Sequence, residues 1–261
     1  QSRVACGDVD GDGLDEIAVG MGTYPQSGGW VVLLDDVAHQ MGILKWFRIG
    51  TTGYRSTNGE TWPALGDIDH DGRAEVLIGM GAYPTDGGYV YLYEDGSRAY
   101  ALKMALRIPP SAYRDASGET RPTTGNLSGS ADTGGREIVV ALGRGSACRV
   151  LIFADAALNH RYLWGYAPGW NAYSTANGET WATCGDVVGG DEDEIVVGLG
   201  RGGAGCYHIR SVTAGATRWK LFPWLTYSAS VGETRPSAGD VDGDGRAELA
   251  LGMGSYPANG G

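Results

Sequence analysis

The sequence contains few of the residue patterns on which catalytic sites depend. Its 261 residues include only four histidines, which fall at unrelated positions of the repeat described below: His39, His70, His160 and His208. There is no G-x-S-x-G nucleophile motif and no phosphate-binding loop of the G-x-x-x-x-G-K-[ST] type. The four cysteines form no C-x-x-C pair and no cluster with histidine, which excludes a zinc site of the usual spacing. We therefore expect no catalytic residues and a protein that is not an enzyme.

Long apolar runs and helical periodicity are also absent. No run approaches the roughly 18 apolar residues of a membrane-spanning helix, and no segment shows a 3.6-residue apolar stripe long enough for a helix. Lys and Arg number 20 against 31 Asp and Glu, a net charge of −11, with no basic stripe to neutralise phosphates. These absences exclude a membrane span and nucleic acid as a partner. The 42% of hydrophobic residues is enough for a core, so we expect a soluble all-β protein.

Glycine is abundant, and an acidic motif recurs with it. The stretch GDVDGDGLDEIAVGMG at residues 7–22 returns as GDIDHDGRAEVLIGMG from Gly66 and as GDVDGDGRAELALGMG from Gly239. Aspartates stand at loop positions one, three and five, a glycine follows at six, and a glutamate stands at nine. Several oxygens on one short loop suit calcium, a hard cation that takes six to eight oxygen ligands. The sequence therefore predicts about three calcium ions, one in each loop.

The predicted ligands are side-chain carboxylates and one backbone carbonyl in each loop. They are Asp8, Asp10, Asp12, Glu16 and the carbonyl of Leu14; Asp67, Asp69, Asp71, Glu75 and the carbonyl of Arg73; and Asp240, Asp242, Asp244, Glu248 and the carbonyl of Arg246. An EF-hand loop would need an acidic residue at position twelve and flanking helices. Position twelve is Val19, Ile78 or Leu251, within a short apolar run typical of a buried strand. The loops are therefore not EF-hands.

The acidic motif marks a repeat that fills the chain. Its first glycine recurs at Gly7, Gly66, Gly125, Gly185 and Gly239, and a Gly-Glu-Thr triplet with a tyrosine six residues before its glutamate precedes each of the last four. Each unit contains four short apolar segments separated by turn residues, which is typical of a four-stranded propeller blade. We expect one β-propeller or propeller fragment of about 4.5 blades. The predicted units are 1–60, 61–119, 120–179, 180–233 and the incomplete 234–261.

The third and fourth units have altered loops. In the fourth, Asp186 and Glu194 remain but Val188 and Gly190 replace aspartates, so we expect at most weak metal binding. In the third, Asn126, Ser128 and Ser130 stand at the ligand positions. Only the units with intact loops carry a Tyr-Pro turn after the second strand, whose tyrosines are either ligand-binding residues or packing residues of the blades: Tyr24, Tyr83 and Tyr256. Similarly, Trp62 and Trp181 alternate with arginines at one repeat position, which indicates a ligand surface or cation–π packing between blades.

These loops and their repeat resemble the FG-GAP repeat of integrin α-chain head domains and of related bacterial and fungal propellers. The family loop has the pattern D-x-[DN]-x-D-G-x-x-[DE], and the resemblance covers essentially the whole chain. This chain departs from the family in having glutamate at position nine and only three phenylalanines. The resemblance implies calcium binding by the matching residues. It leaves the ligand open, because propellers of this kind bind proteins or sugars, and others support enzymes.

Three functions remain open at this stage. The first is an extracellular, secreted or cell-surface binding and adhesion module, whose partner is a carbohydrate, as for a lectin, or an extracellular protein. The second is the propeller part of a polysaccharide-processing enzyme, and the third is a structural array of a surface fibre. An extracellular location is expected because low-affinity calcium loops suit roughly millimolar calcium.

The positions of the chain ends and of the cysteines within the repeat unit lead to further expectations. The last unit holds only two of its four strands, so we expect either part of a longer array or a small ring with a half-built blade. An unpaired strand edge there predicts self-association. A Cys148–Cys206 disulfide is conceivable, but equivalent positions of neighbouring blades are far apart for disulfide geometry. Four buried free thiols are the favoured alternative.

Overall fold

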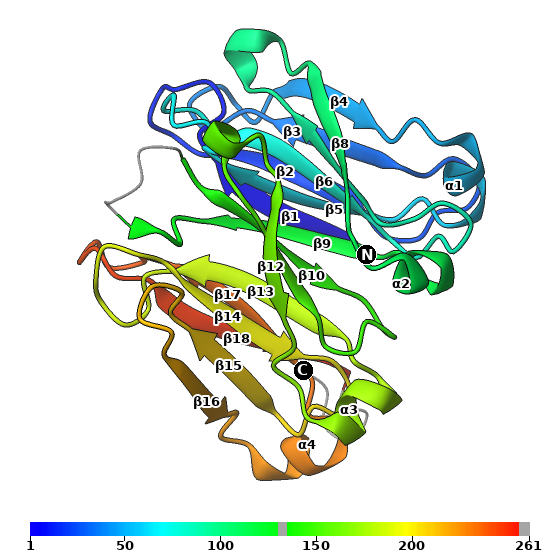
Figure 1. Cartoon of the computed structure of the whole chain (residues 1–261). Coiled ribbons are helices and arrows are strands. Elements are labelled where there is room, and N and C mark those ends of the chain that lie inside the picture. The colour runs from blue at the N-terminus through cyan, green and yellow to red at the C-terminus, as the bar shows by residue number, and fades with distance from the viewer. Residues whose placement is uncertain (130–134, 256–261) are drawn as a thin grey trace.

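The computed structural model describes residues 1–129 and 135–255, which form five antiparallel sheets stacked side by side (Figure 1). The first blade contains β1 (Ser2–Gly7), β2 (Glu16–Met21), β3 (Trp30–Leu34) and β4 (Ile43–Arg48); the second contains β5 (Thr61–Gly66), β6 (Glu75–Met80), β7 (Tyr89–Tyr93) and β8 (Leu102–Arg107). The third contains β9 (Thr120–Gly125), β10 (Glu137–Leu142), β11 (Val150–Phe153) and β12 (Tyr162–Tyr166); the fourth contains β13 (Thr180–Gly185), β14 (Glu194–Leu199), β15 (Cys206–Arg210) and β16 (Thr217–Leu221). The fifth contains β17 (Thr234–Gly239) and β18 (Glu248–Met253). The predicted propeller fold is confirmed.

Each blade packs one sheet face against the next blade along the chain. We call the side toward the following blade the forward face, and the side toward the preceding blade the backward face. Ala18 and Leu33 on the forward face of the first blade lie in one core cluster with Ile78 of the second. Leu77 and Leu92 of the second share the next cluster with Val140 of the third. The central strands β6, β10 and β14 are therefore buried on both faces, which explains their continuous apolar sequences.

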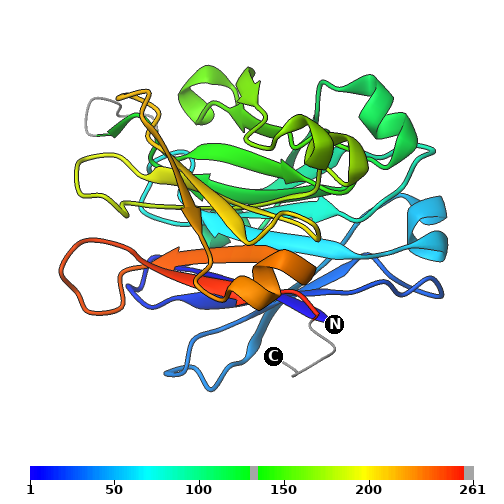
Figure 2. The ribbon, with the colours of Figure 1, turned by 90° about the horizontal axis from the view of Figure 1, so that it is seen from below.

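The innermost strands of successive blades, β1, β5, β9, β13 and β17, lie next to one another in the propeller. Figure 2 shows the stacked blades from below. The second residues of the innermost strands form an alternating ladder of arginine and tryptophan: Arg3, Trp62, Arg121, Trp181 and Arg235. The Arg121 guanidinium carbon lies 3.7 Å from the Trp181 ring centroid and 4.9 Å from that of Trp62. The cation–π alternative for this repeat position is thus the one that the structure supports.

Four short helices follow the outermost strands and were not predicted. They are α1 (Thr52–Thr57), α2 (Ser111–Ala116), α3 (Asn171–Ala176) and α4 (Leu225–Ser230). Six residues are too few for an apolar stripe, so periodicity could not detect them. Each helix buries the repeated tyrosine, and the Tyr113 hydroxyl donates to the Glu119 carbonyl at 2.9 Å. The corresponding Tyr227 hydroxyl also accepts the Gly254 N–H at 2.7 Å, which ties the helix to the following strand pair.

All four cysteines are free, but the prediction that all four are buried is wrong. Cys148 is fully buried, and Cys184 and Cys206 are half-buried. Cys6 is exposed because it lies on the backward face of the first blade, where no blade packs among the described residues. No helix in the described part of the chain is both long and apolar enough to cross a membrane.

His208 on β15 provides a pH-dependent contribution to stability. It is 4% exposed, its ring lies 4.8 Å from that of Trp219, and burial, with the nearby Arg210 charge, lowers its pKa to about 4. A folded pKa below the unfolded value near 6.5 means that the stabilising contribution is present above pH 6.5 and is lost as the pH falls toward 4. We expect the free energy of unfolding to fall by on the order of 1–3 kcal/mol over this interval.

His208→Phe keeps an aromatic ring in this position and serves as the comparison. Denaturant unfolding at pH 7 and at pH 4.5 should show a smaller loss of stability for the variant than for the unmodified protein. Equal losses would mean that other groups account for the pH dependence.

Candidate metal centre

The acidic loops between the first two strands of blades 1, 2 and 5 share one backbone geometry. Asp8 accepts the N–H groups of Gly11 at 2.6 Å and Gly13 at 2.9 Å, and Asp12 accepts that of Leu14 at 2.9 Å. The positive φ of Gly13, 89°, allows the chain to reverse at this point. In blade 5, Asp240 accepts the N–H of the corresponding glycine, Gly245, at 2.9 Å. The loops thus fold around their own carboxylates, as the alternate aspartates require.

Three aspartates converge in each of the first two loops. Asp8, Asp10 and Asp12 each offer a carboxylate oxygen within 4.8 Å of the others, and so do the second set of aspartates, Asp67, Asp69 and Asp71. Carboxylates at this separation repel one another unless a cation lies between them.

The glutamate at position nine has one carboxylate oxygen without a partner in both loops. Glu16 and Glu75 are 0% exposed, and one oxygen of each accepts a backbone N–H, from Val9 at 2.8 Å and from Ile68 at 3.0 Å. The other oxygen, Oε1, is buried in both residues and has no hydrogen-bond partner among the described residues. A buried carboxylate oxygen in this state is costly. Because the oxygen adjoins a cluster of aspartates, the donor set fits a hard cation such as calcium.

The electrostatics of the two glutamates agree with this geometry. Burial raises the pKa of Glu75 to about 8, and the charges of Asp69 and Asp67 add to the effect. The pKa of Glu16 is raised to about 7, mainly by burial and in smaller part by the neighbouring aspartates. A bound divalent cation would reverse these shifts, because it favours the ionised carboxylates.

Two further carboxylates, which the sequence analysis missed, join the clusters from the turn after the third strand. Asp35 lies within 4.8 Å of Asp10 and Glu16 by their carboxylate oxygens, and Glu94 lies at the corresponding place in the second blade. They stand 59 residues apart at one repeat phase, and this equivalence was the available signal. In the second blade Arg98 Nη1 lies 2.9 Å from Asp69 and Lys103 Nζ lies 3.4 Å from Glu94, so two cationic side chains already partly neutralise this cluster.

The loops of the third and fourth blades differ from the intact loops in the hydrogen bonds of their acidic residues. Both oxygens of Glu137 have protein partners, the N–H of Leu127 at 2.9 Å and the hydroxyl of Ser128 at 3.0 Å. In the fourth loop Asp186 still accepts two backbone N–H groups, and Glu194 accepts those of Val187 and Val188. Of the predicted ligand positions in the third loop, Ser130 lies outside the described residues. Because each oxygen of Glu137 has a protein partner, the third loop satisfies its glutamate without a cation.

The glutamate of the fifth loop is exposed, unlike those of the first two loops. Glu248 accepts the Val241 N–H at 2.9 Å, as in the first two loops, but it is exposed because no blade covers this face among the described residues.

Tyr24 is 44% exposed, whereas Tyr83 is half-buried with its ring 5.5 Å from that of Tyr54. Tyr256 lies outside the described residues. Tyr24 and Tyr83 thus differ in exposure, and the binding role of the tyrosines stays a prediction.

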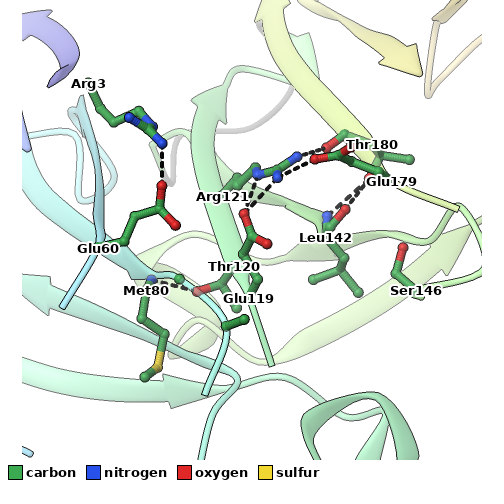
Figure 3. A network of polar contacts seen from close by, with 12 residues as sticks. Arg3, Glu60, Met80, Glu119, Thr120, Arg121, Leu142, Ser146, Glu179 and Thr180 are labelled. Atoms are coloured by element: carbon green, nitrogen blue, oxygen red, sulfur yellow. Dashed lines mark hydrogen bonds and ion pairs between the residues drawn. The ribbon is translucent and has the colours of Figure 1, made fainter. Parts of the chain in front are cut away.

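A network of ion pairs holds the ladder on the propeller axis (Figure 3). Arg121 Nη2 lies 2.6 Å from Glu119 and 2.5 Å from Glu179, and its Nη1 donates to the Thr180 carbonyl at 3.0 Å. Arg3 pairs with Glu60 two blades earlier, as Arg121 does with Glu179. The arginines and glutamates pair with one another within the protein, so the axis is a structural contact between blades.

Comparison with known proteins agrees with the repeat. Residues 61–93 match the FG-GAP repeat family. A stretch of 118 residues, 43% of the chain, is 32% identical to integrin alpha-4 of Xenopus laevis, of which it covers 11%. The resemblance to FG-GAP and integrin α-chain repeats is therefore confirmed.

Solved structures share the fold. The exotype rhamnogalacturonan lyase YesX superimposes with a TM-score of 0.52 over 99% of this chain and 54% of the lyase, at 16% identity. The rhamnogalacturonan lyase YesW gives a TM-score of 0.50 over 96% of this chain and 55% of its own, at 14% identity. The chain thus spans about half the length of these lyases, and the likeness concerns the fold alone.

Proposed function

From the FG-GAP repeat that residues 61–93 match, we propose that this chain is a calcium-stabilised β-propeller that binds an extracellular protein partner. The observation that carries the metal assignment is the buried, unpartnered Oε1 atom of Glu16 and of Glu75, each beside three convergent aspartates. The local identity to integrin alpha-4 supports a protein partner and a location outside the cell.

Calcium would stabilise the surface that we propose to bind the partner, the rim formed by the acidic loops. Each acidic loop connects the first two strands of its blade, so all of them lie at one end of the blades, opposite α1–α4 (Figure 1). Adjacent loops also contact each other, since Arg73 Nε donates to the Asp10 carbonyl at 2.9 Å and the Ala74 N–H donates to that of Asp8 at 2.6 Å. An ion in one loop would therefore stabilise a continuous rim, and this rim is the proposed binding surface.

The number of calcium ions tests the assignment of the sites. We expect three ions per chain by calorimetric titration, and two after Asp69→Ala or Asp242→Ala, because each substitution removes the position-three ligand of an intact loop. Glu194→Ala is the matched control. Its loop has no acidic residue at positions three and five, so the count should not change. Equal losses from all three substitutions would contradict the assignment of the fourth loop.

The nature of the partner is tested with the intact chain, in calcium and in EDTA. We expect binding to one or more members of a panel of extracellular matrix proteins, lost in EDTA. Binding to a glycan array alone would contradict the protein partner and favour a lectin-like module.

The second candidate function is the propeller part of a polysaccharide-processing enzyme. The fold shared with two rhamnogalacturonan lyases favours it, as does Lys103 beside the acidic cluster of the second blade. The ammonium group of Lys103 forms ion pairs with Asp69 and Glu94, so it lies against the carboxylates of the cluster. Release of unsaturated oligosaccharides from a pectic polysaccharide, abolished by Lys103→Ala, would establish this alternative.

A further inference from the structure

A hollow of about 250 Å³ opens between the third and fourth blades, beside the loop of the third blade. Most of its wall residues are apolar and come from both blades; they include Leu127, Ile152 and Trp164 of the third blade and Val212 of the fourth. Two acidic residues, Glu137 and Asp155, also line it. An apolar hollow with a few polar groups is typical of a site for a small molecule.

The hollow results from a shorter turn in the fourth blade. Eight residues, 154–161, connect the third and fourth strands of the third blade, as in the first two blades, whereas six residues, 211–216, connect those of the fourth. The longer turn carries a side chain that packs toward the preceding blade. Tyr100 of the second blade lies 6.1 Å from Phe47 of the first by ring centroids, and His160 of the third blade is 4% exposed. The shorter turn lacks this residue, so the space beside the third blade stays open.

Asp155 has one carboxylate oxygen without a partner at this hollow. The residue is 2% exposed, and its Oδ1 accepts the Leu158 N–H at 3.2 Å. Its Oδ2 is buried and makes no hydrogen bond to any residue that the structure describes. A buried oxygen in this state is costly, so a donor that reaches it gains a strong interaction.

The equivalent aspartates of the first two blades pair the same oxygen with a basic side chain three residues later. Asp36 Oδ2 lies 2.8 Å from His39 Nδ1, and Asp95 Oδ2 lies 2.9 Å from Arg98 Nη1. The third blade has Leu158 at this position, and this leucine lines the hollow. The aspartate of the third blade therefore lacks the basic partner that its equivalents have.

The composition of the hollow selects an organic cation over a metal ion. Glu137, the other acidic residue, accepts hydrogen bonds on both oxygens, from the Leu127 N–H and the Ser128 hydroxyl. One open carboxylate oxygen is too few for calcium, which takes six to eight oxygen ligands. An ammonium group instead needs one anionic acceptor for its charge, and an attached alkyl chain gains from apolar walls.

We propose that this hollow binds an alkylammonium group, whose nitrogen donates to Asp155 Oδ2 and whose alkyl chain lies against Leu127 and Ile152. The bound nitrogen takes the part that Arg98 has beside Asp95 in the second blade. This chemistry belongs both to a free amine and to a lysine side chain of another protein. The site does not depend on the calcium ions or on the partner proposed above.

Titration of the intact chain with n-butylammonium tests the proposal. Calcium is kept at a saturating concentration, so that the amine does not compete for the acidic loops. The indole N–H signal of Trp164, identified with Trp164→Phe, should shift in a saturable manner with a dissociation constant on the order of 1 mM. n-Butanol, which has the same alkyl chain without the charge, should bind at least about tenfold more weakly. Equal binding of the alcohol, or no saturable shift with the amine, would overturn the proposal.

Two variants test the role of the carboxylate. Asp155→Asn keeps the Oδ1 acceptor and removes the charge, and it should weaken amine binding at least about tenfold. Leu158→Arg supplies the basic side chain that the second blade has, and it should weaken binding as much by occupying Oδ2. Asp115→Asn, at an exposed position of α2, changes the net charge as Asp155→Asn does and should bind as the unmodified chain does. Undiminished binding by a folded Leu158→Arg variant would contradict the site even if Asp155→Asn failed to fold.

A blocked lysine, Nα-acetyl-lysine methylamide, distinguishes the two sources of the ammonium group. Binding of both n-butylammonium and the blocked lysine would show that the hollow admits a lysine side chain of a protein. Binding of n-butylammonium alone would identify free amines as the ligands. Both outcomes uphold the site, whereas failure of both compounds to shift the Trp164 signal would refute it.

Discussion

Calcium is expected to raise the melting temperature of this protein by roughly 15–30 °C above its value in EDTA. At a free calcium concentration of about 100 times the dissociation constant, one site adds about 2.7 kcal/mol, and three sites add about 8 kcal/mol. For a chain of this size each kcal/mol shifts the melting temperature by about 2–4 °C. The physical source is the removal of repulsion among the loop carboxylates and the satisfaction of the buried oxygens of Glu16 and Glu75.

The pH dependence of the calcium-free protein provides a second signature. The pKa of buried Glu75 is about 8 in the folded chain, above its unfolded value near 4.5. Its contribution to stability is therefore fully present below pH 4.5 and is lost as the pH rises through 8. We expect the protein in EDTA to melt at a lower temperature at pH 8.5 than at pH 6, and the gain from calcium to be larger at pH 8.5.

Thermal melts in calcium, magnesium and EDTA, together with metal analysis, measure both effects. Magnesium should stabilise less than calcium, because it retains its water ligands and rarely occupies an all-protein site. Melting curves that coincide in calcium and EDTA, with less than one calcium per chain, would refute the metal assignment.

Arg121→Ala is expected to lower the free energy of unfolding by about 3–5 kcal/mol. The substitution deprives the partly buried carboxylates of Glu119 and Glu179 of their buried guanidinium partner and removes the donor to the Thr180 carbonyl. It also removes the guanidinium that contacts the rings of both Trp62 and Trp181. Since Arg121 connects the second, third and fourth blades, we expect its loss to weaken the packing between them.

The chain offers a matched control at the same repeat position. Arg235 stacks on Trp181 at 4.4 Å and pairs with Glu233, but its side chain is 50% exposed. Arg235→Ala should therefore cost about 0–1 kcal/mol. The triple variant Arg121→Met, Glu119→Gln, Glu179→Gln removes the charges together and should recover much of the loss. Denaturant unfolding measures all three, and equal effects of Arg121→Ala and Arg235→Ala would show that burial does not set the cost.

The acidic loops, the strands and the repeat could be predicted from the sequence because their causes are local. Alternate aspartates followed by glycine make a loop that folds on its own carboxylates, as Asp8 and Gly13 do. Short apolar runs bounded by glycine form strands wherever they occur, and the recurrence of both features implies stacked blades. The same reasoning separated the third and fourth loops from the intact ones, since their ligand positions are visibly substituted.

Only the tertiary structure decided which groups meet across the blades and which remain uncovered. Asp35 joins Asp10 and Glu16 because the sheet brings the end of β3 beside the first loop, a contact that spacing along the chain does not encode. Arg121 meets Glu179 because the third and fourth blades pack face to face, 58 residues apart in sequence. Cys6 and Cys184 hold equivalent repeat positions, yet Cys184 is half-buried against the preceding blade and Cys6 is exposed. The burial of a residue depends on the neighbouring blade, and the sequence of the residue's own repeat unit does not show whether that neighbour is present.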